Sequence, residues 1–152
     1  PSFDEEIDVV QNSTSAYTPQ LQRVLSAAKI LHLQTLVRQV PATRSVVGYA
    51  VRLAQGSRPN HPEAPSFIKE WVNWGAGPRA SQYLVLGAKA RAITHGRFAA
   101  SIDDVRALAP SVLRHRILTN FNAEAEGVTS LAIIERLLEV VRPEAVDVAL
   151  AS

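Results

Sequence analysis

The fold is decided by residues 75–96, GAGPRASQYLVLGAKARAITHG. Pro78 suits the first position of a helix, because the N–H that it lacks would have no helical partner there and its φ is already close to helical. The residues from Arg79 to Thr94 are apolar on most sides, which is typical of a helix that packs between other helices. His95-Gly96 then ends the run. This stretch therefore predicts a central helix over residues 79–94.

Further helices are predicted on both sides from capping residues and from apolar residues at helical spacing. Ser2 with Glu5, and Ser101 with Asp104, form capping boxes. Pro110 should kink the helix that follows Ser101 or split it in two. One short strand is expected over 117–121, paired near 97–99. The helices are expected over 2–10, 26–40, 43–56, 79–94, 101–113 and 129–141, and the cap of the last helix is either Thr129 or Ser130. This pattern predicts a mainly α fold, a compact helical bundle of about six or seven helices with at most a minor two-stranded β element.

The composition narrows the class of protein. The chain has 152 residues, of which 47% are hydrophobic and 20% are charged, and it contains neither Cys nor Met. This length suits a single domain, which we expect to cover residues 1–152. The lack of Cys excludes thiol catalysis, cysteine metal sites and disulfides. No apolar run reaches the roughly 18 residues that a membrane span needs. Because the chain opens at Pro1 without a Met, we expect it to be a piece of a longer protein.

Acidic residues are unevenly distributed, although the net charge is only +2. No acid occurs between Asp8 and Glu63, and none occurs from Trp71 to Ile102. Solvated helix faces would explain these two acid-free stretches, and so would surfaces that face phosphate or an acidic neighbour. Both interpretations stay open on sequence alone. The bases in the two stretches are Arg23, Lys29, Arg38, Arg44, Arg52, Arg58, Arg79, Lys89, Arg91 and Arg97.

Most catalytic signatures are missing. The four His residues lack His-Glu-x-x-His spacing, so no metal site is predicted. The glycines at 75 and 77 do not form a Walker A loop, because no Gly-Lys-[Ser/Thr] follows them. Asp103-Asp104 fits the acidic first turn of a helix better than an acid/base pair. We therefore do not expect the isolated chain to be an enzyme.

Arg79 needs a physical explanation. It falls in the first turn of the central helix, where the helix dipole is positive and a cation costs about 0.3–1 kcal/mol. A bound anion would reverse that sign, because free N–H groups and the guanidinium would converge on one phosphate. Alternatively, the side chain bends away to an acid such as Glu70. Physical reasoning alone leaves both interpretations open.

The run from Trp74 to Ser81, followed by Gly96-Arg97 and Asp103-Asp104-Val105, resembles the C-terminal lid of MoxR-type AAA+ ATPases. The opening segment Pro1 to Glu6 resembles the stretch that leaves the ATPase core, and Leu33-Gln34-x-Leu36-Val37 fits the early lid helices. At the position of Gly77, members of that family often have Ser. The matching motifs are Trp74 to Ser81, Gly96-Arg97, Asp103-Asp104-Val105 and Val112-Leu113-Arg114-His115-Arg116. The resemblance divides the chain into a connecting helix over 1–14, which would come from a core outside this chain, and a lid over 15–152.

The resemblance also implies a function. Arg79 falls at the sensor 2 position, whose guanidinium reaches the terminal phosphate of ATP, and Gly77 and Pro78 shape that helix start. Walker A and Walker B elements are absent, so ATP and Mg²⁺ belong to the parent protein and neither is expected to bind the fragment alone. The parent would be a cytoplasmic ATP hydrolase in a hexameric ring, with chaperone-like activity or a role in metal-cofactor maturation. Its partners would be its own core domain, neighbouring subunits and a von Willebrand A-domain protein.

Other prominent residues have two interpretations each. Arg114, His115 and Arg116 near a helix end would either cap it or contact the next subunit. Trp71 and Trp74 fit core or hinge anchors better than an adenine-stacking pair. Arg97 would fix a turn or face phosphate.

Two hypotheses from other classes remain. A free-standing nucleic-acid-binding module would use the basic stretch 23–58, although no reading helix or aromatic platform is recognisable there. A helix–helix adaptor would bind no small ligand. Nucleic acid is the less favoured partner.

Overall fold

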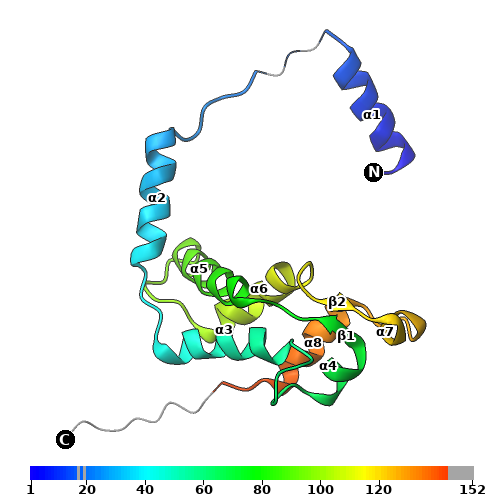
Figure 1. Cartoon of the computed structure of the whole chain (residues 1–152). Coiled ribbons are helices and arrows are strands. Elements are labelled where there is room, and N and C mark those ends of the chain that lie inside the picture. The colour runs from blue at the N-terminus through cyan, green and yellow to red at the C-terminus, as the bar shows by residue number, and fades with distance from the viewer. Residues whose placement is uncertain (17, 19, 144–152) are drawn as a thin grey trace, which may run out of the picture. The chain divides into compact units, whose positions relative to one another are not determined.

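The computed structural model describes residues 1–16, 18 and 20–143. The chain divides into two compact units, Pro1–His32 and Leu33–Ser152, which are described separately (Figure 1). Helix α1, Phe3–Thr14, lies in the first unit, and helix α2, Ala27–Gln39, runs across the boundary. The predicted capping box of α1 is confirmed, because the Ser2 N–H donates to Glu5 Oε2 at 2.7 Å and Ser2 Oγ accepts from the Glu5 N–H at 3.3 Å. The helix continues one turn past its predicted end at Val10.

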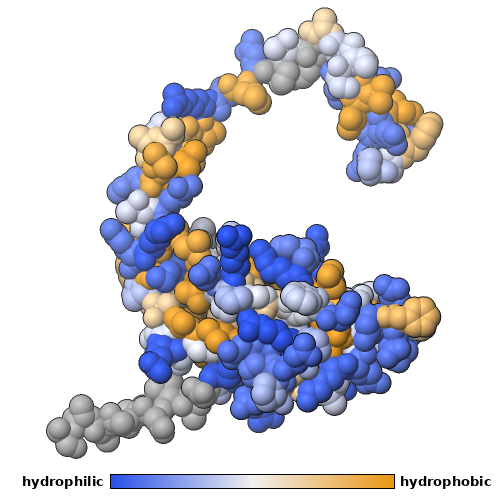
Figure 2. Space-filling model, viewed as in Figure 1, coloured by the Kyte–Doolittle hydropathy of each residue, from blue (hydrophilic) through white to orange (hydrophobic). Residues whose placement is uncertain are grey.

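Neither α1 nor α2 has a buried residue. Apolar side chains are instead exposed on both, and Figure 2 shows them as orange patches on each helix. On α1 they include Phe3, Ile7 and Val10, which share one face because they are spaced four and three residues apart. Helix α1 is therefore an amphipathic segment whose apolar face is exposed within its own unit.

The core of the second unit is formed mainly by four helices, α3 (Arg44–Gly56), α5 (Pro78–Thr94), α6 (Ile102–Leu113) and α8 (Ser130–Val140). Helix α5 packs against α3 and α6, as its apolar composition predicts. It buries a strip of small and medium residues at four-residue spacing, Ala80, Leu84, Ala88 and Ala92. Its other apolar side chains are not all buried, since Tyr83 is 49% exposed and Leu86 is 39% exposed.

Short elements join these helices. Helix α4, Ser66–Trp71, leads into strand β1, Val72–Trp74, and strand β2, Leu118–Thr119, leads into helix α7, Phe121–Ala125. The two strands pair antiparallel, with Val72 opposite Thr119. The prediction of a strand near 117–121 is therefore right, but its predicted partner at 97–99 is wrong. Arg97 is instead bonded to Asp104, and the Ala100 N–H donates to the Pro41 carbonyl at 3.0 Å.

The predicted helix starts are confirmed at Thr43, Ser101 and Thr129, whose side chains each accept the N–H three residues on. Pro110 does not split α6, which continues to Leu113 as one helix. The buried residues Ala109 and Leu113 flank Pro110, so packing of this turn offsets the missing backbone bond. The mainly α fold with a minor two-stranded sheet is confirmed, with eight helices in the described residues. None of these helices is long and apolar enough to cross a membrane.

Candidate functional site

The loop before α5 is fixed to the end of α3. A Cβ atom on Gly75 would lie 2.2 Å from the Ser57 carbonyl oxygen, so no larger residue fits there. The buried Ser57 Oγ accepts from the Ala76 N–H at 2.9 Å and donates to the Ala54 carbonyl at 2.7 Å. Arg58 Nε donates to the Ala76 carbonyl at 2.7 Å. Ser57 and Arg58 therefore position the start of α5, and Gly75 permits a close approach within the chain itself.

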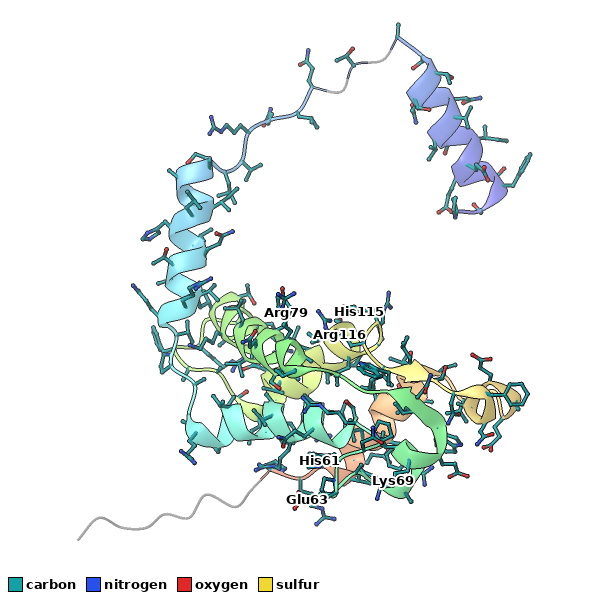
Figure 3. The ribbon with its side chains drawn as sticks, in the orientation of Figure 1. His61, Glu63, Lys69, Arg79, His115 and Arg116 are labelled. Atoms are coloured by element: carbon teal, nitrogen blue, oxygen red, sulfur yellow. The ribbon has the colours of Figure 1, made fainter. Side chains whose placement is uncertain are left out.

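Arg79 lies on this fixed helix start with its side chain exposed (Figure 3). In the described part of the chain it has no hydrogen-bond or ion-pair partner, and the alternative contact with Glu70 is not formed. The N-cap residue Gly77 supplies no side-chain cap, and a Cβ placed on it would meet no atom within 4 Å. The first turn of α5 therefore combines an unpaired cation, an uncapped helix end and open space.

A pocket of about 250 Å³ adjoins this helix start. It is lined by Arg58, which lies two residues after α3, by Trp74 at the end of β1 and by Pro78 at the first position of α5. Trp74 is 70% exposed, so it is not a core anchor, and its alternative role at a hinge stays a prediction. Trp71 is a core anchor: it packs on the core, and its Nε1 donates to Glu126 Oε2 at 3.2 Å.

The opposite end of α5 is closed by ion pairs. Arg91 Nη1 lies 2.9 Å from Asp104 Oδ1, and both terminal nitrogens of Arg97 bond the same carboxylate at 2.5 and 2.7 Å. The Arg97 hydrogen bonds, helped by those from Ser101, hold the pKa of the buried Asp104 far below its usual range. Asp104 also completes the capping box with Ser101. The expectation that Arg97 fixes a turn is confirmed, and Asp104 acts as a structural anion instead of as an acid or base.

The end of α6 lies beside α5. Arg116 Cζ lies 5.2 Å from the centre of the Tyr83 ring, and its guanidinium also contacts the Val112 carbonyl and His115 Nε2. Tyr83 is four residues after Arg79, so the two side chains share a face of α5. Figure 3 shows Arg79, His115 and Arg116 on one side of this unit and His61, Glu63 and Lys69 on the other.

Sequence reasoning did not identify Ser57 and Arg58 as positioning residues. They lie 19 and 18 residues before Ala76, the residue that they hold, and no local pattern marks such a pair. In the sequence Arg58 is only one of the bases of the first acid-free stretch. Among the described residues, no three His, Asp or Glu side chains lie close enough to share a metal ion.

Comparison with known proteins agrees with the fold. Residues 66–137 match the AAA lid domain family. The chain is 30% identical over 141 residues to Chaperone MoxR1 of Mycobacterium tuberculosis, covering 93% of this chain and 37% of that protein. It is 32% identical to the uncharacterized protein YeaC of Bacillus subtilis, covering 93% of this chain and 42% of that protein. The crystal structure of a putative ATPase from Cytophaga hutchinsonii superposes with a TM-score of 0.78 at 27% identity, over 95% of this chain and 44% of that one.

The helical fold and the family match together define an AAA lid domain. The relatives make the class narrower: this chain is a lid domain of the MoxR type of AAA+ ATPase. It spans about two fifths of the length of the relatives that it matches.

Proposed function

We propose that this chain is the C-terminal lid of a MoxR-like ATPase and that it supplies Arg79 to the nucleotide as the sensor 2 arginine. In this proposal residues 1–14 connect the lid to an ATPase core and residues 15–152 form the lid. The observation that carries it is the unpaired guanidinium of Arg79 at the uncapped, positive end of α5. A cation at that position lowers stability unless an anion binds beside it, so an anionic ligand would offset the unfavourable interaction of Arg79 with the helix dipole.

The residues at this helix start fit a phosphate group. Arg79 would donate hydrogen bonds to the oxygens of the terminal phosphate, and Gly77 and Pro78 would let the backbone at the helix end approach it. ATP supplies the phosphoryl group that passes to water. Arg79 would stabilise the charge that develops on that group, as other arginine clamps do. Among the described residues no group of three His, Asp or Glu side chains could hold a metal ion, so in this proposal Mg²⁺ would be held by the core of the parent protein.

The remaining roles follow from membership in the MoxR type. We infer that the lid closes over ATP as a rigid body and passes on the nucleotide state in a hexameric ring in the cytoplasm. The natural contacts of the lid would be its own core and the neighbouring subunits, with a von Willebrand A-domain protein as a further partner. The work done would be chaperone-like remodelling or maturation of a metal-containing enzyme.

The decisive experiment compares two arginines in the full-length parent. Arg79→Ala should reduce ATP turnover by about a hundredfold, the size of effect seen when one electrostatic donor to a transition state is removed. Arg44→Ala is the matched control, because Arg44 is also an exposed arginine in the first turn of a helix, that of α3. Circular dichroism should find both variants folded. Unchanged turnover in Arg79→Ala would overturn the assignment of Arg79.

The isolated chain should show no ATP hydrolysis and weak or no ATP binding, because most phosphate ligands would lie in the core. A measurable turnover of ATP by residues 1–152 alone would contradict the proposal that hydrolysis requires the core.

A further inference from the structure

A long groove runs beside α5, on surface that the proposed nucleotide contact does not use. It consists of two adjoining hollows of about 590 and 630 Å³ that share Arg38, Tyr83 and Leu86. Helix α3 borders one part, the end of α6 borders the other, and α2 borders both. We call the two hollows together the α5 groove. The α5 residues that line it run from Ser81 to Ala90, a length of about 14 Å at 1.5 Å per residue.

The groove presents exposed apolar side chains. Leu86 is 39% exposed, Tyr83 is 49% exposed and Val47 is 39% exposed, and all three line it. Val37, Val51, Val85 and Val112 add further apolar surface. Contiguous apolar surface of this kind marks an interaction site more often than isolated exposed residues do. Its length matches two to three helical turns, which suits the apolar stripe of a helix.

The charges around the groove all have one sign. The basic residues that line it are Arg38, Lys89, His115 and Arg116, and none of its lining residues is Asp or Glu. The two acid-free stretches of the sequence meet here, because α2 and α3 belong to the first stretch and α5 belongs to the second. Lys89 Nζ donates to the Arg38 carbonyl at 3.2 Å, so α5 and the end of α2 are joined at this border. A partner that covers the groove without burying unpaired cations must bring acids.

The same residues disfavour nucleic acid. Single strands bind on open aromatic faces, and Tyr83 is the one aromatic residue that lines the groove. Arg116 lies over that ring, with its Cζ 5.2 Å from the ring centre, so one face of the ring is already covered. The other apolar residues that line the groove are aliphatic, and they provide no stacking platform.

We propose that the α5 groove binds an acidic amphipathic helix of a partner protein, with apolar residues at three- and four-residue spacing against Leu86 and Val47 and with carboxylates toward Arg38 and Lys89. This contact is separate from Arg79 and needs no nucleotide.

The test uses a designed probe. A fluorescein-labelled helical peptide of about 18 residues carries Leu at three- and four-residue spacing and Glu elsewhere, and its anisotropy is measured with the 152-residue chain. We expect binding that weakens with added salt. Leu86→Asp should reduce the affinity by about tenfold or more. Leu131→Asp should leave it unchanged, because Leu131 has a similar exposure of 43% but lies on α8, outside the groove.

Charge provides an independent arm. Arg38→Glu should weaken binding of the acidic peptide, whereas Lys69→Glu, an exposed base on α4 outside the groove, should not. A peptide in which every Glu is replaced by Lys should not bind. Circular dichroism checks that each variant is folded.

Four outcomes would overturn the proposal. The first is no binding of the acidic peptide at low salt, and the second is equal binding of the acidic and basic peptides. The third is an equal effect of Leu86→Asp and Leu131→Asp. The fourth is a single-stranded RNA oligonucleotide that binds more tightly than the acidic peptide and is released by Arg38→Glu. Self-association of the chain that Leu86→Asp abolishes would assign the groove to a second copy instead.

Discussion

At its first turn α5 carries Arg79, whose guanidinium has no partner in the described part of the chain, whereas at its last turn Arg91 shares the buried carboxylate of Asp104 with Arg97. The helix dipole opposes a cation at the first position and favours one at the second. The same residue type therefore costs stability at one end of the helix and contributes it at the other. The stability that Arg91 contributes explains why an arginine is present at the last turn. The arginine at the first turn, Arg79, needs an explanation from outside the isolated lid.

The largest effect is expected from Asp104→Asn. The amide cannot pair with two guanidinium groups, and we expect the free energy of unfolding to fall by about 3 kcal/mol. The loss stays at the low end for a buried pair, because the side chains of Arg91 and Arg97 are 34% and 39% exposed and stay partly hydrated. Urea denaturation measures it. Asp103→Asn, the exposed neighbour in the same turn, should change stability by about 0.5 kcal/mol or less, and equal effects of the two variants would contradict the role of Asp104.

The same carboxyl should make stability depend on acid. The pKa of Asp104 is lower in the folded chain than its ordinary value of 3.8, chiefly because Arg97 donates hydrogen bonds to the carboxylate. Such a group contributes its full stability above the unfolded pKa and loses it as the pH falls toward the folded pKa. Stability should therefore decline progressively below about pH 4, and Asp104→Asn should flatten that decline. Denaturation midpoints measured from pH 6 to pH 2 test this, and parallel curves for the two proteins would refute it.

A middle-sized effect is expected at the loop before α5. Gly75→Ala places a methyl group against the Ser57 carbonyl, so the backbone must shift, and we expect a loss of about 2 kcal/mol. Gly77→Ser is the matched change two residues later, where space is open and the backbone is extended. It should leave stability unchanged or raise it by a few tenths of a kcal/mol, because Ser caps a helix at least as well as Gly. Thermal denaturation of both variants decides whether Gly75 is the tight position.

The smallest effect concerns the open end of α5. Arg79→Glu should raise the stability of the isolated chain by about 0.5 kcal/mol, because an anion replaces a cation at the positive end of the helix. Arg44→Glu should do the same at the start of α3. In the full-length parent only Arg79→Glu should abolish ATP turnover. A loss of stability in Arg79→Glu would show that Arg79 has a structural partner.

The sequence predicted most reliably what is encoded locally. Thr43, Ser101 and Thr129 cap the helices that follow them, because a cap needs only the N–H groups of the next turn. Helices α4 and α7 have 6 and 5 residues, too few for a periodic pattern, and the partner of β2 lies more than 40 residues away. Such pairings depend on tertiary contacts.

The candidate site divides in the same way. Pro78 and Arg79 were identified from sequence because a helix start and a misplaced cation are local signals. Ser57 and Arg58, which position that helix start, carry no local signal of their own, and neither does the meeting of the two acid-free stretches at the α5 groove. Spatial neighbours from distant parts of the chain supply both features.

The contact of Gly75 with Ser57 has a mechanical consequence. Because no room remains for even one methyl group, the loop before α5 is packed tightly against the end of α3 and cannot shift independently of it. A displacement of the start of α5 through Arg79 would therefore move the end of α3 with it. Helix α3 has 13 residues, about 20 Å, so the displacement would reach its other end at Arg44. The lid would then transmit motion from α5 to α3 as one rigid unit, and the close contact at Gly75 would couple the two helices.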